Sequence, residues 1–337
     1  MNVKSHQGLL FALIGIGLAV AFPFLTSDRY LLRIGEMVLI YWIIVAGLNL
    51  LVGYVGLMSI GHVGLLSIGG YAFAILAGKL GLHPYAALIA SGGVTALAAG
   101  LLCLPSLRLP GFYFALATIA FALIMVELAL GFSGLTGGTV GLAVPAFPAP
   151  FKRTIGEYWL ALGIATVVTA MTWNLARSMW GRAMISIRDS EVAAQSVAVS
   201  IFRTKLTVFL FSGFCAGVAG GLFARAQSHI TPEAFNFDVS LMFFTAIIIG
   251  GRGSIIGPMV GTLLLAVIPD VFASMQRYTA FFYGGILLAV VLAIPQGLGV
   301  WAKDHLGNIF GKSTADDQRG AQQPNMPALT ALLQEKA

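Results

Sequence analysis

The stretch FYFALATIAFALIMVELAL, residues 112–130, carries one charged side chain, Glu127, in an otherwise apolar run. A helix of about 20 mostly apolar residues is long enough to cross the hydrocarbon core of a bilayer. Because lipid offers the backbone no hydrogen-bonding partners, a crossing segment must satisfy its own peptide groups, as an α-helix does. The stretch therefore predicts a membrane-spanning helix.

The composition of the whole chain agrees with a lipid environment. Of the 337 residues, 58% are hydrophobic and only 9% are charged, whereas roughly 25% of the residues in soluble domains are charged. The net charge is +6, but Lys and Arg stand singly between apolar runs, which is typical of the loops of a membrane protein. We therefore expect contact with membrane lipid and no binding of nucleic acid.

Apolar stretches of this kind recur along the chain, and together they predict an all-α fold, a polytopic transmembrane helix bundle of about 8–10 spans. The predicted spans lie near residues 8–25, 34–52, 59–78, 86–104, 112–130, 158–173, 207–224, 240–250, 254–269 and 279–294.

Two parts of this pattern are open to a second interpretation. Residues 8–25 follow a lysine like a cleaved signal peptide, but the missing small-residue cleavage pattern and the later spans favour a retained helix. Residues 240–250 and 254–269 are short and meet at GGRGS, residues 250–254. Because glycines permit the left-handed backbone that breaks helices, this pair predicts either a re-entrant hairpin or two full spans.

Two connections between the spans stand out by composition. Residues 132–157 hold several glycines and prolines, which predicts an ordered loop outside the bilayer. Residues 174–205 form the largest basic connection, and short basic loops resist translocation, so we place it in the cytoplasm. Counting spans outward puts both termini on the cytoplasmic side. Residues 1–311 are then the expected transmembrane domain, and the polar residues 312–337 predict a disordered tail.

The sequence indicates no energy source within the chain. GNIFGKS, residues 307–313, has one residue too few between its first glycine and the Gly-Lys-Ser to cradle phosphates. Histidines are scattered, and both cysteines lie in hydrophobic stretches, which predicts neither a metal site nor a disulfide framework. We therefore expect no cofactor in this chain. An intramembrane enzyme whose groups converge from distant spans is the less favoured alternative.

The basic connection contains GRAMISIRDSEVAAQSVA, residues 181–198, which predicts a short cytoplasmic helix despite its polarity. Asp189 and Glu191 near a helix start are favoured by the helix dipole. The small Ala193 and Ala194 leave a surface that a groove on a partner can hold closely. A solvated connecting helix explains the same residues equally well.

Several motifs occur in one order between about residues 47 and 300. They are GLMSIGH (56–62) with Gly69, Gly70 and Tyr71, LPGFYFALAT (109–118), LTGG (135–138), RDSEVAA (188–194), and GGRGS (250–254) followed by Gly257 and Gly261. A chain with these motifs resembles the inner-membrane permeases of branched-chain amino acid ABC transporters, specifically the LivM-like branch.

The resemblance implies a role for the basic connection. Its Arg188, Asp189, Glu191, Ala193 and Ala194 match the coupling motif by which such permeases dock on a cytoplasmic ATPase. It also implies a second, homologous permease subunit, two ATPase subunits that bind the ATP, a periplasmic solute-binding protein, and a location in the bacterial inner membrane.

One position of the coupling segment departs from the family pattern. Ala198 stands where the motif commonly has glycine, so we expect the helix to continue through this position.

Polar side chains inside apolar spans normally face the interior of a bundle, so they are the candidates for the substrate pathway. They are Asn49, Ser59, His62, Ser67, Thr118 and Glu127. For His62, a structural role with a neighbouring carbonyl as partner competes with lining of the pathway. Thr118 is expected to bond to the backbone of its own helix.

Glu127 is predicted to lie near the outer end of its span, where it stays ionised at little cost. In the family pattern an acid stands four residues earlier and a basic residue just before this site, where this chain has Leu123 and Val126. That departure argues against leucine, isoleucine or valine as the substrate. Because the solute-binding protein usually sets the selectivity of such an importer, the substrate is open among amino acids, amides, urea and small organic acids.

A self-sufficient secondary transporter or channel, with Glu127 or His62 relaying protons, is the rival from another class. Proton relays usually need several acids inside the spans, and we identify none besides Glu127. The hydropathy also shows no clear inverted halves of the kind that secondary transporters use.

Overall fold

The computed structural model describes residues 15, 17–26, 28–106, 109, 111–151, 154–271 and 285 of the chain. The predicted tail 312–337 lies outside these residues, as does the predicted span 279–294 apart from Gly285. In the predicted first span, residues 17–25 are helical. The hydroxyl of Tyr158 donates a hydrogen bond of 2.7 Å to the carbonyl of Ala19, which attaches this segment to the bundle.

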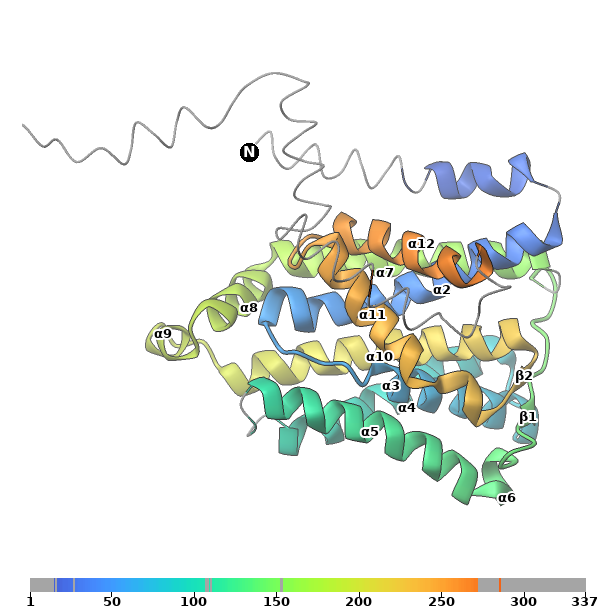
Figure 1. Cartoon of the computed structure of the whole chain (residues 1–337), viewed down its shortest axis with the longest axis horizontal. Helices are drawn as coiled ribbons and strands as arrows, with labels where there is room; N and C mark the ends of the chain where they lie inside the picture. The colour runs from blue at the N-terminus through green and yellow to red at the C-terminus, as the bar shows by residue number, and fades with distance from the viewer. Residues whose placement is uncertain are drawn as a thin grey trace, which may run out of the picture.

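The described residues form a bundle of helices with one two-residue strand pair (Figure 1). The helices are α2 (Arg29–Asn49), α3 (His62–Ala74), α4 (Pro84–Ser106), α5 (Gly111–Gly131), α6 (Ser133–Thr136), α7 (Thr154–Arg177), α8 (Met179–Asp189), α9 (Glu191–Ser196), α10 (Ile201–Gln227), α11 (Phe237–Gly250) and α12 (Ile256–Val271). π-Helical segments Leu50–Val55 and Ile75–Lys79 extend α2 and α3, and a 3-10 turn, Pro232–Phe235, precedes α11. Strands β1 (Leu142–Ala143) and β2 (His229–Ile230) pair antiparallel, with Leu142 opposite Ile230.

Within the described residues, seven helical segments are long and apolar enough to cross a membrane. They are Arg29–Val55, His62–Lys79, Pro84–Pro105, Gly111–Gly131, Thr154–Arg177, Ile201–Gln227 and Pro232–Gly250. Each coincides with a span predicted from the sequence, which confirms the all-α polytopic fold. The predicted span 254–269 corresponds to the shorter apolar helix α12.

Helices α11 and α12 form a closely packed antiparallel hairpin. A Cβ added to Gly257 would overlap the carbonyl of Gly250, and one added to Gly261 would overlap that of Ala246. Only residues without side chains allow two helix backbones to approach this closely. Gly257 and Gly261 of α12, which face the backbone of Gly250 and Ala246 in α11, therefore fix the pairing of the two helices.

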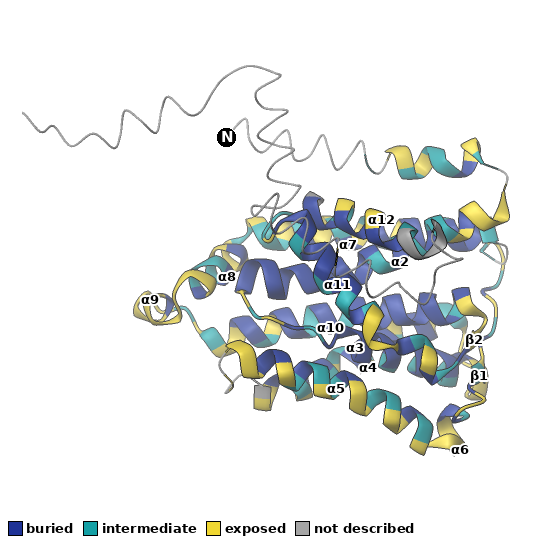
Figure 2. Cartoon of the chain, in the orientation of Figure 1, coloured by how far each residue is buried: buried dark blue, intermediate teal, exposed yellow. Residues whose placement is uncertain are grey.

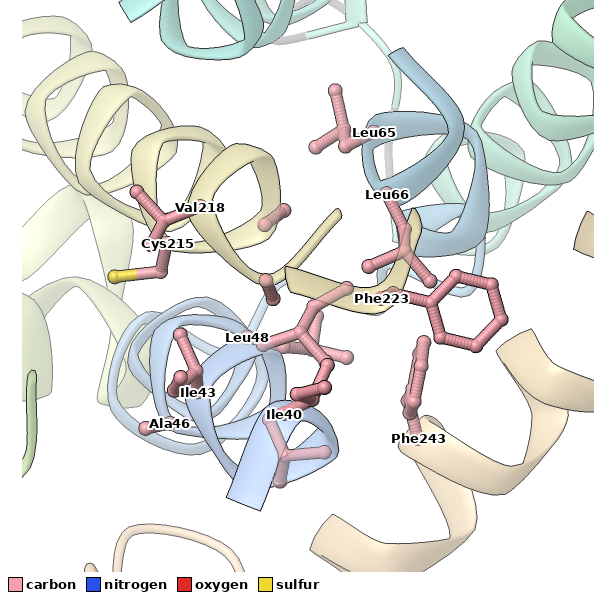
Figure 3. Packing of buried hydrophobic residues seen from close by; sticks show 14 of the residues in the cluster. Ile40, Ile43, Ala46, Leu48, Leu65, Leu66, Cys215, Val218, Phe223 and Phe243 are labelled. Carbon is pink, nitrogen blue, oxygen red and sulfur yellow. The ribbon is translucent and has the colours of Figure 1, made fainter. Parts of the chain in front are cut away.

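The core lies where α2, α3 and α10 meet (Figure 2). Figure 3 shows Ile40, Ile43 and Leu48 of α2 beside Cys215, Val218 and Phe223 of α10, with Leu65 and Leu66 of α3 and Phe243 of α11 at the same junction. Helices α3 and α10 approach through small residues, since a Cβ on Gly69 would lie 2.5 Å from the Cα of Gly217. Helix α5 stands at the edge of the bundle and exposes one side along its length (Figure 2).

Candidate functional site

Helices α8 and α9 project from one end of the bundle, opposite the end that carries α6 and the strand pair (Figure 1). Ser178 begins α8, its side chain accepting a hydrogen bond of 3.1 Å from the Trp180 amide. Ser190 is extended and begins α9, its hydroxyl accepting a bond of 3.2 Å from the Ala193 amide. The prediction of one helix over 181–198 was therefore wrong, because Ser190 divides it into two. Glu191 does lie in a first helical turn, but Asp189 ends α8.

The expected continuation of the helix through Ala198 was also wrong. Helix α9 ends at Ser196, and Ala198 takes a left-handed conformation with φ 60°. Its amide bonds to the carbonyl of Gln195 at 3.0 Å, and the Val199 amide bonds to that of Ala194 at 3.1 Å. The turn redirects the chain into α10, which requires a conformation that glycine adopts more cheaply than alanine.

The residues of the predicted coupling motif make two contacts with the membrane-spanning helices. Nη1 of Arg188 donates a hydrogen bond of 2.9 Å to the carbonyl of Gly53, at the end of the α2 extension. Nζ of Lys205, in the second turn of α10, lies 2.7 Å from Oε1 of Glu191. Nε of Arg188 is 3.3 Å from Oδ1 of Asp189, which is itself largely exposed. These contacts attach α8 to the α2 extension and α9 to α10.

Residues 189–197, here named the coupling turn, expose apolar side chains at the tip of this projection. Val192 is 76% exposed and Val197 69% exposed, and Ala193 is exposed between them. Ala194 is buried against the rest of the chain. Apolar side chains clustered on a projecting segment typically mark a protein contact surface. The two alanines of the motif thus have different surroundings, one facing outward and one packed inward.

Among the pathway candidates, Ser59 and His62 lie together. Nδ1 of His62 is 2.9 Å from the Ser59 hydroxyl, and Nε2 is 2.9 Å from the hydroxyl of Ser212 on α10. All three side chains are buried. His62 is therefore held by two serines, whereas the structural alternative considered from the sequence named a carbonyl.

Thr118 and Asn49 each bond to the backbone of a distant connecting segment. Oγ1 of Thr118 donates to the carbonyl of Ala115 at 2.8 Å, the expected bond within its own helix, and also accepts from the Ile60 amide at 3.1 Å. Nδ2 of Asn49 donates to the Ser254 carbonyl at 2.7 Å, while its Oδ1 is buried without a partner among the described residues. Each side chain thus joins its own helix to a connecting segment that is distant in the sequence, since Ile60 precedes α3 and Ser254 precedes α12.

The last two pathway candidates differ in their burial. Ser67 is buried in α3, whereas Glu127 is exposed on α5 and has no hydrogen-bond or ion-pair partner in the part of the chain that the structure describes. The structure therefore brings Ser59 and His62 into contact and leaves Glu127 on the outer surface of the bundle.

Sequence reasoning missed two acids within the membrane-spanning helices. Glu36 of α2 is buried, and Glu157 of α7 lies 2.7 Å from Nε of Arg225 on α10. Arg33, one turn before Glu36, bonds to the carbonyl of Ala226. The expectation that Glu127 is the one acid of the spans was wrong. Both acids could have been found from the sequence, since Glu36 lies inside the predicted span 34–52 and Glu157 lies immediately before the predicted span 158–173.

Comparison with known proteins supplies the family. The family model described as "Branched-chain amino acid transport system / permease component" matches residues 30–291. The chain is 33% identical over 316 residues, 86% of this chain and 74% of the relative, to the high-affinity branched-chain amino acid transport system permease protein LivM of Salmonella typhimurium. No solved structure matches the chain significantly.

More distant relatives are named as permeases of other import systems. The autoinducer 2 import system permease protein LsrC of an Enterobacter species is 26% identical over 52% of this chain and 62% of its own length. The fructose import permease protein FrcC of Rhizobium meliloti is 28% identical over 42% of each chain. With its bundle of apolar helices and the match over most of its length, this chain belongs to the family of branched-chain amino acid transport permeases, as a multi-pass membrane subunit of an ABC importer.

Proposed function

We propose that this chain and a second, homologous permease subunit enclose an alternating-access path across the bacterial inner membrane. Two cytoplasmic ATPase subunits bind and hydrolyse the ATP, and a periplasmic solute-binding protein delivers the solute. The chain itself is not an enzyme and uses no cofactor. Both of its termini lie in the cytoplasm, and residues 312–337 form a tail outside the transmembrane permease domain 1–311.

The coupling turn is the observation that carries this proposal. It presents exposed Val192, Ala193 and Val197 beyond the end of the bundle, which suits a groove on a partner protein. Behind this surface, Arg188 and Glu191 bond to α2 and α10. An ATPase that moves the coupling turn would therefore move two central helices. The other two motif residues belong to the coupling turn as well: Asp189 is the last residue of α8, and Ala194 is buried against the rest of the chain.

The distribution of charge supports a cytoplasmic position for this end of the bundle. Residues 174–205 carry an excess of basic side chains, and Arg252 stands in the α11–α12 connection beside Gly253, which approaches Arg188. Basic residues in short connections are retained on the cytoplasmic side of a membrane. The end with α6 and the strand pair then faces the periplasm.

The substrate we propose is a branched-chain or related amino acid, because 86% of this chain is similar to the LivM permease of Salmonella typhimurium. Relatives named for autoinducer 2 and for fructose show that similar chains serve chemically different solutes. Amides, urea and small organic acids therefore belong in any substrate screen. A pathway within this chain would be built from the buried polar groups Ser59, His62, Ser67, Thr118 and Asn49. Glu127, the remaining candidate, lies apart from them on the outer surface of α5.

Docking is tested by replacing Ala193 with arginine in the complete importer. The exposed position tolerates the larger side chain in this subunit, while its bulk and charge would keep a partner from the coupling turn. We expect loss of co-purifying ATPase and of solute uptake, with Ala193→Ser as the matched small replacement that retains both. Normal assembly and uptake by Ala193→Arg would refute the proposal.

One observation favours a second candidate, a self-sufficient secondary transporter. Glu36 is a buried acid in α2, and intramembrane acids often relay protons. His62, by contrast, has both ring nitrogens taken by serines. An uncoupler applied while cellular ATP is held constant separates the two: uptake persists in the importer and collapses in the proton-driven transporter.

A further inference from the structure

The end of α2 that lies next to α8 has an unusual backbone conformation. Its last residues, Leu50–Val55, wind as a π-helix that stops at Gly56, whose φ is 83°. The carbonyls in the last turn of a helix lack partners within that helix. Here the carbonyl of Gly53 receives its partner from outside, the guanidinium of Arg188 on α8. π-Helical turns are frequent at functional sites.

Three glycines, Gly53, Gly56 and Gly253, surround the Arg188 side chain and are named here the glycine socket. A Cβ on Gly56 would lie 2.8 Å from Cγ of Arg188, and one on Gly253 would lie 3.2 Å from its Nη1. A Cβ on Gly53 would lie 2.6 Å from the amide nitrogen of Gly253. Side chains at Gly56 and Gly253 would compete with the arginine for space, whereas one at Gly53 would press against Asn49 and the Gly253 backbone. The socket thus brings α8, the α2 extension and the α11–α12 connection together at one point.

A second contact joins two of these three elements independently of Arg188. Nδ2 of Asn49 donates to the carbonyl of Ser254 at 2.7 Å. The hydroxyl of Ser254 accepts from the Gly257 amide at 3.2 Å, in the first turn of α12. The end of α2 and the start of α12 are therefore fastened to each other, and Arg188 is the side chain by which α8 engages the pair.

We propose that Arg188 in the glycine socket is the joint through which the coupling turn moves α2 and the α11–α12 hairpin as one unit. This inference rests on the proposed function, in which an ATPase displaces the coupling turn. Arg188 acts in this proposal as a positioning residue, through its contact with the α2 extension. An arginine suits the task because its planar guanidinium keeps its charge and offers several donors in a fixed geometry. Its Nη1 meets the Gly53 carbonyl while its stem lies against Gly56.

The test uses the complete importer, with this chain, its partner permease and both ATPase subunits, reconstituted in lipid vesicles. Arg188→Gln removes the charge and shortens the side chain, and Arg182→Gln makes the same change at an exposed position of the same helix. The quantity measured is solute transported per ATP hydrolysed. For Arg188→Gln we expect this ratio to fall about tenfold, the effect of losing one charge-assisted hydrogen bond. Arg182→Gln is expected to keep it.

Conservative replacement and a second site distinguish a joint from a merely structural contact. Arg188→Lys retains a charged donor and is expected to recover part of the ratio. Gly253→Ala would place a Cβ 3.2 Å from Nη1 of Arg188 and also strain the backbone at φ 77°. It is expected to lower the ratio while the ATPase still assembles. ATP hydrolysis that continues without matching transport is the signature of a broken joint, whereas general destabilisation lowers both activities together.

A direct readout follows the two sides of the joint. Spin labels at Arg182→Cys and Arg252→Cys report the separation of α8 from the α11–α12 connection. In the otherwise unchanged importer this separation should stay constant when ATP binds, and in Arg188→Gln it should change.

Three results would overturn the inference in distinguishable ways. An unchanged transport ratio in both Arg188→Gln and Gly253→Ala refutes the joint and leaves the proposed function intact. Loss of ATPase assembly in Arg188→Gln makes the residue part of the docking surface instead. Failure of the unmodified chain to bind an ATPase refutes the proposed function, and the joint with it.

Discussion

Nζ of Lys205 on α10 lies 2.7 Å from Oε1 of Glu191 on α9, and the two side chains differ greatly in exposure, at 6% and 55%. Removing Glu191 therefore leaves a buried ammonium without its partner, whereas removing Lys205 leaves a carboxylate that water can reach. We expect Glu191→Ala to lower the free energy of unfolding by about 1–3 kcal/mol, and Lys205→Met to lower it less. Denaturation of the purified chain in detergent measures both.

The double variant Glu191→Ala with Lys205→Met is the control for this pair. Because both partners are then absent, most of the stability lost in Glu191→Ala should return. Equal losses in the two single variants would contradict the assigned asymmetry.

His62 links α3 to α10 through two serine hydroxyls, one 2.9 Å from each ring nitrogen. His62→Phe keeps a ring of similar size but leaves both hydroxyls without a partner, at a cost of about 1–3 kcal/mol for each buried group. We expect a clear loss of stability that is partly recovered when Ser59 and Ser212 are also changed to alanine. A fall in solute uptake with unchanged stability would instead assign His62 to the pathway.

Ala198 adopts a left-handed conformation that costs an alanine about 1–2 kcal/mol. Ala198→Gly removes this strain but gives the unfolded chain more freedom, so we expect a net gain of up to about 1 kcal/mol. Val197→Gly, at a neighbouring position with φ −102°, is the matched control and should not stabilise. Thermal unfolding of the two variants side by side checks the prediction, which fails if Ala198→Gly melts earlier than the natural chain.

Glu157 and Arg225 form a largely enclosed ion pair between α7 and α10 at the end of the bundle away from the coupling turn. Glu157→Ala leaves the arginine unpaired, and we expect a loss of about 3–5 kcal/mol. The apolar pair Glu157→Leu with Arg225→Met should be far less damaging, because it removes both charges together. Chemical denaturation measures the three chains, and a double variant as unstable as Glu157→Ala would contradict this account.

Gly257 packs against the backbone of Gly250 in the α11–α12 hairpin. The added methyl of Gly257→Ala would force the two helices apart, with an expected cost of about 1–3 kcal/mol or more. A Cβ added to Gly93 would meet no other atom within 4 Å. Gly93→Ala is therefore the control and should be neutral or slightly stabilising. Comparable behaviour of the two variants would show that the hairpin is not held by this contact.

Much of the fold could be predicted because each span is a local property of the sequence. Seven predicted spans coincide with helices long enough to cross a membrane. The errors arose where local and tertiary requirements compete: the Ser190 hydroxyl begins a new helix, and Ala198 turns left-handed to lead the chain into α10. Glu36 and Glu157 were overlooked because an apolar average conceals single acids.

The sequence indicated which residues are candidates for the site, but it did not indicate which residues they contact. The sequence singled out Arg188 and His62, but their neighbours, Gly53 and Ser212, are 135 and 150 residues away. No periodicity relates residues at such separations. Glu127 is the opposite case. It is prominent in the sequence as a charge within a span, but it is exposed on α5 and has no hydrogen-bond or ion-pair partner among the described residues.

By itself, the sequence determined that this protein is an all-helical membrane protein, since lipid requires long apolar segments whose backbone groups are satisfied within each helix. It also determined where a polar, basic segment must leave the membrane. Only the tertiary structure decided that Arg188 lies among three glycines and that His62 lies between two serines. The physical reason is that helix packing depends on which small residues face each other across an interface, and that choice is made between segments rather than within them.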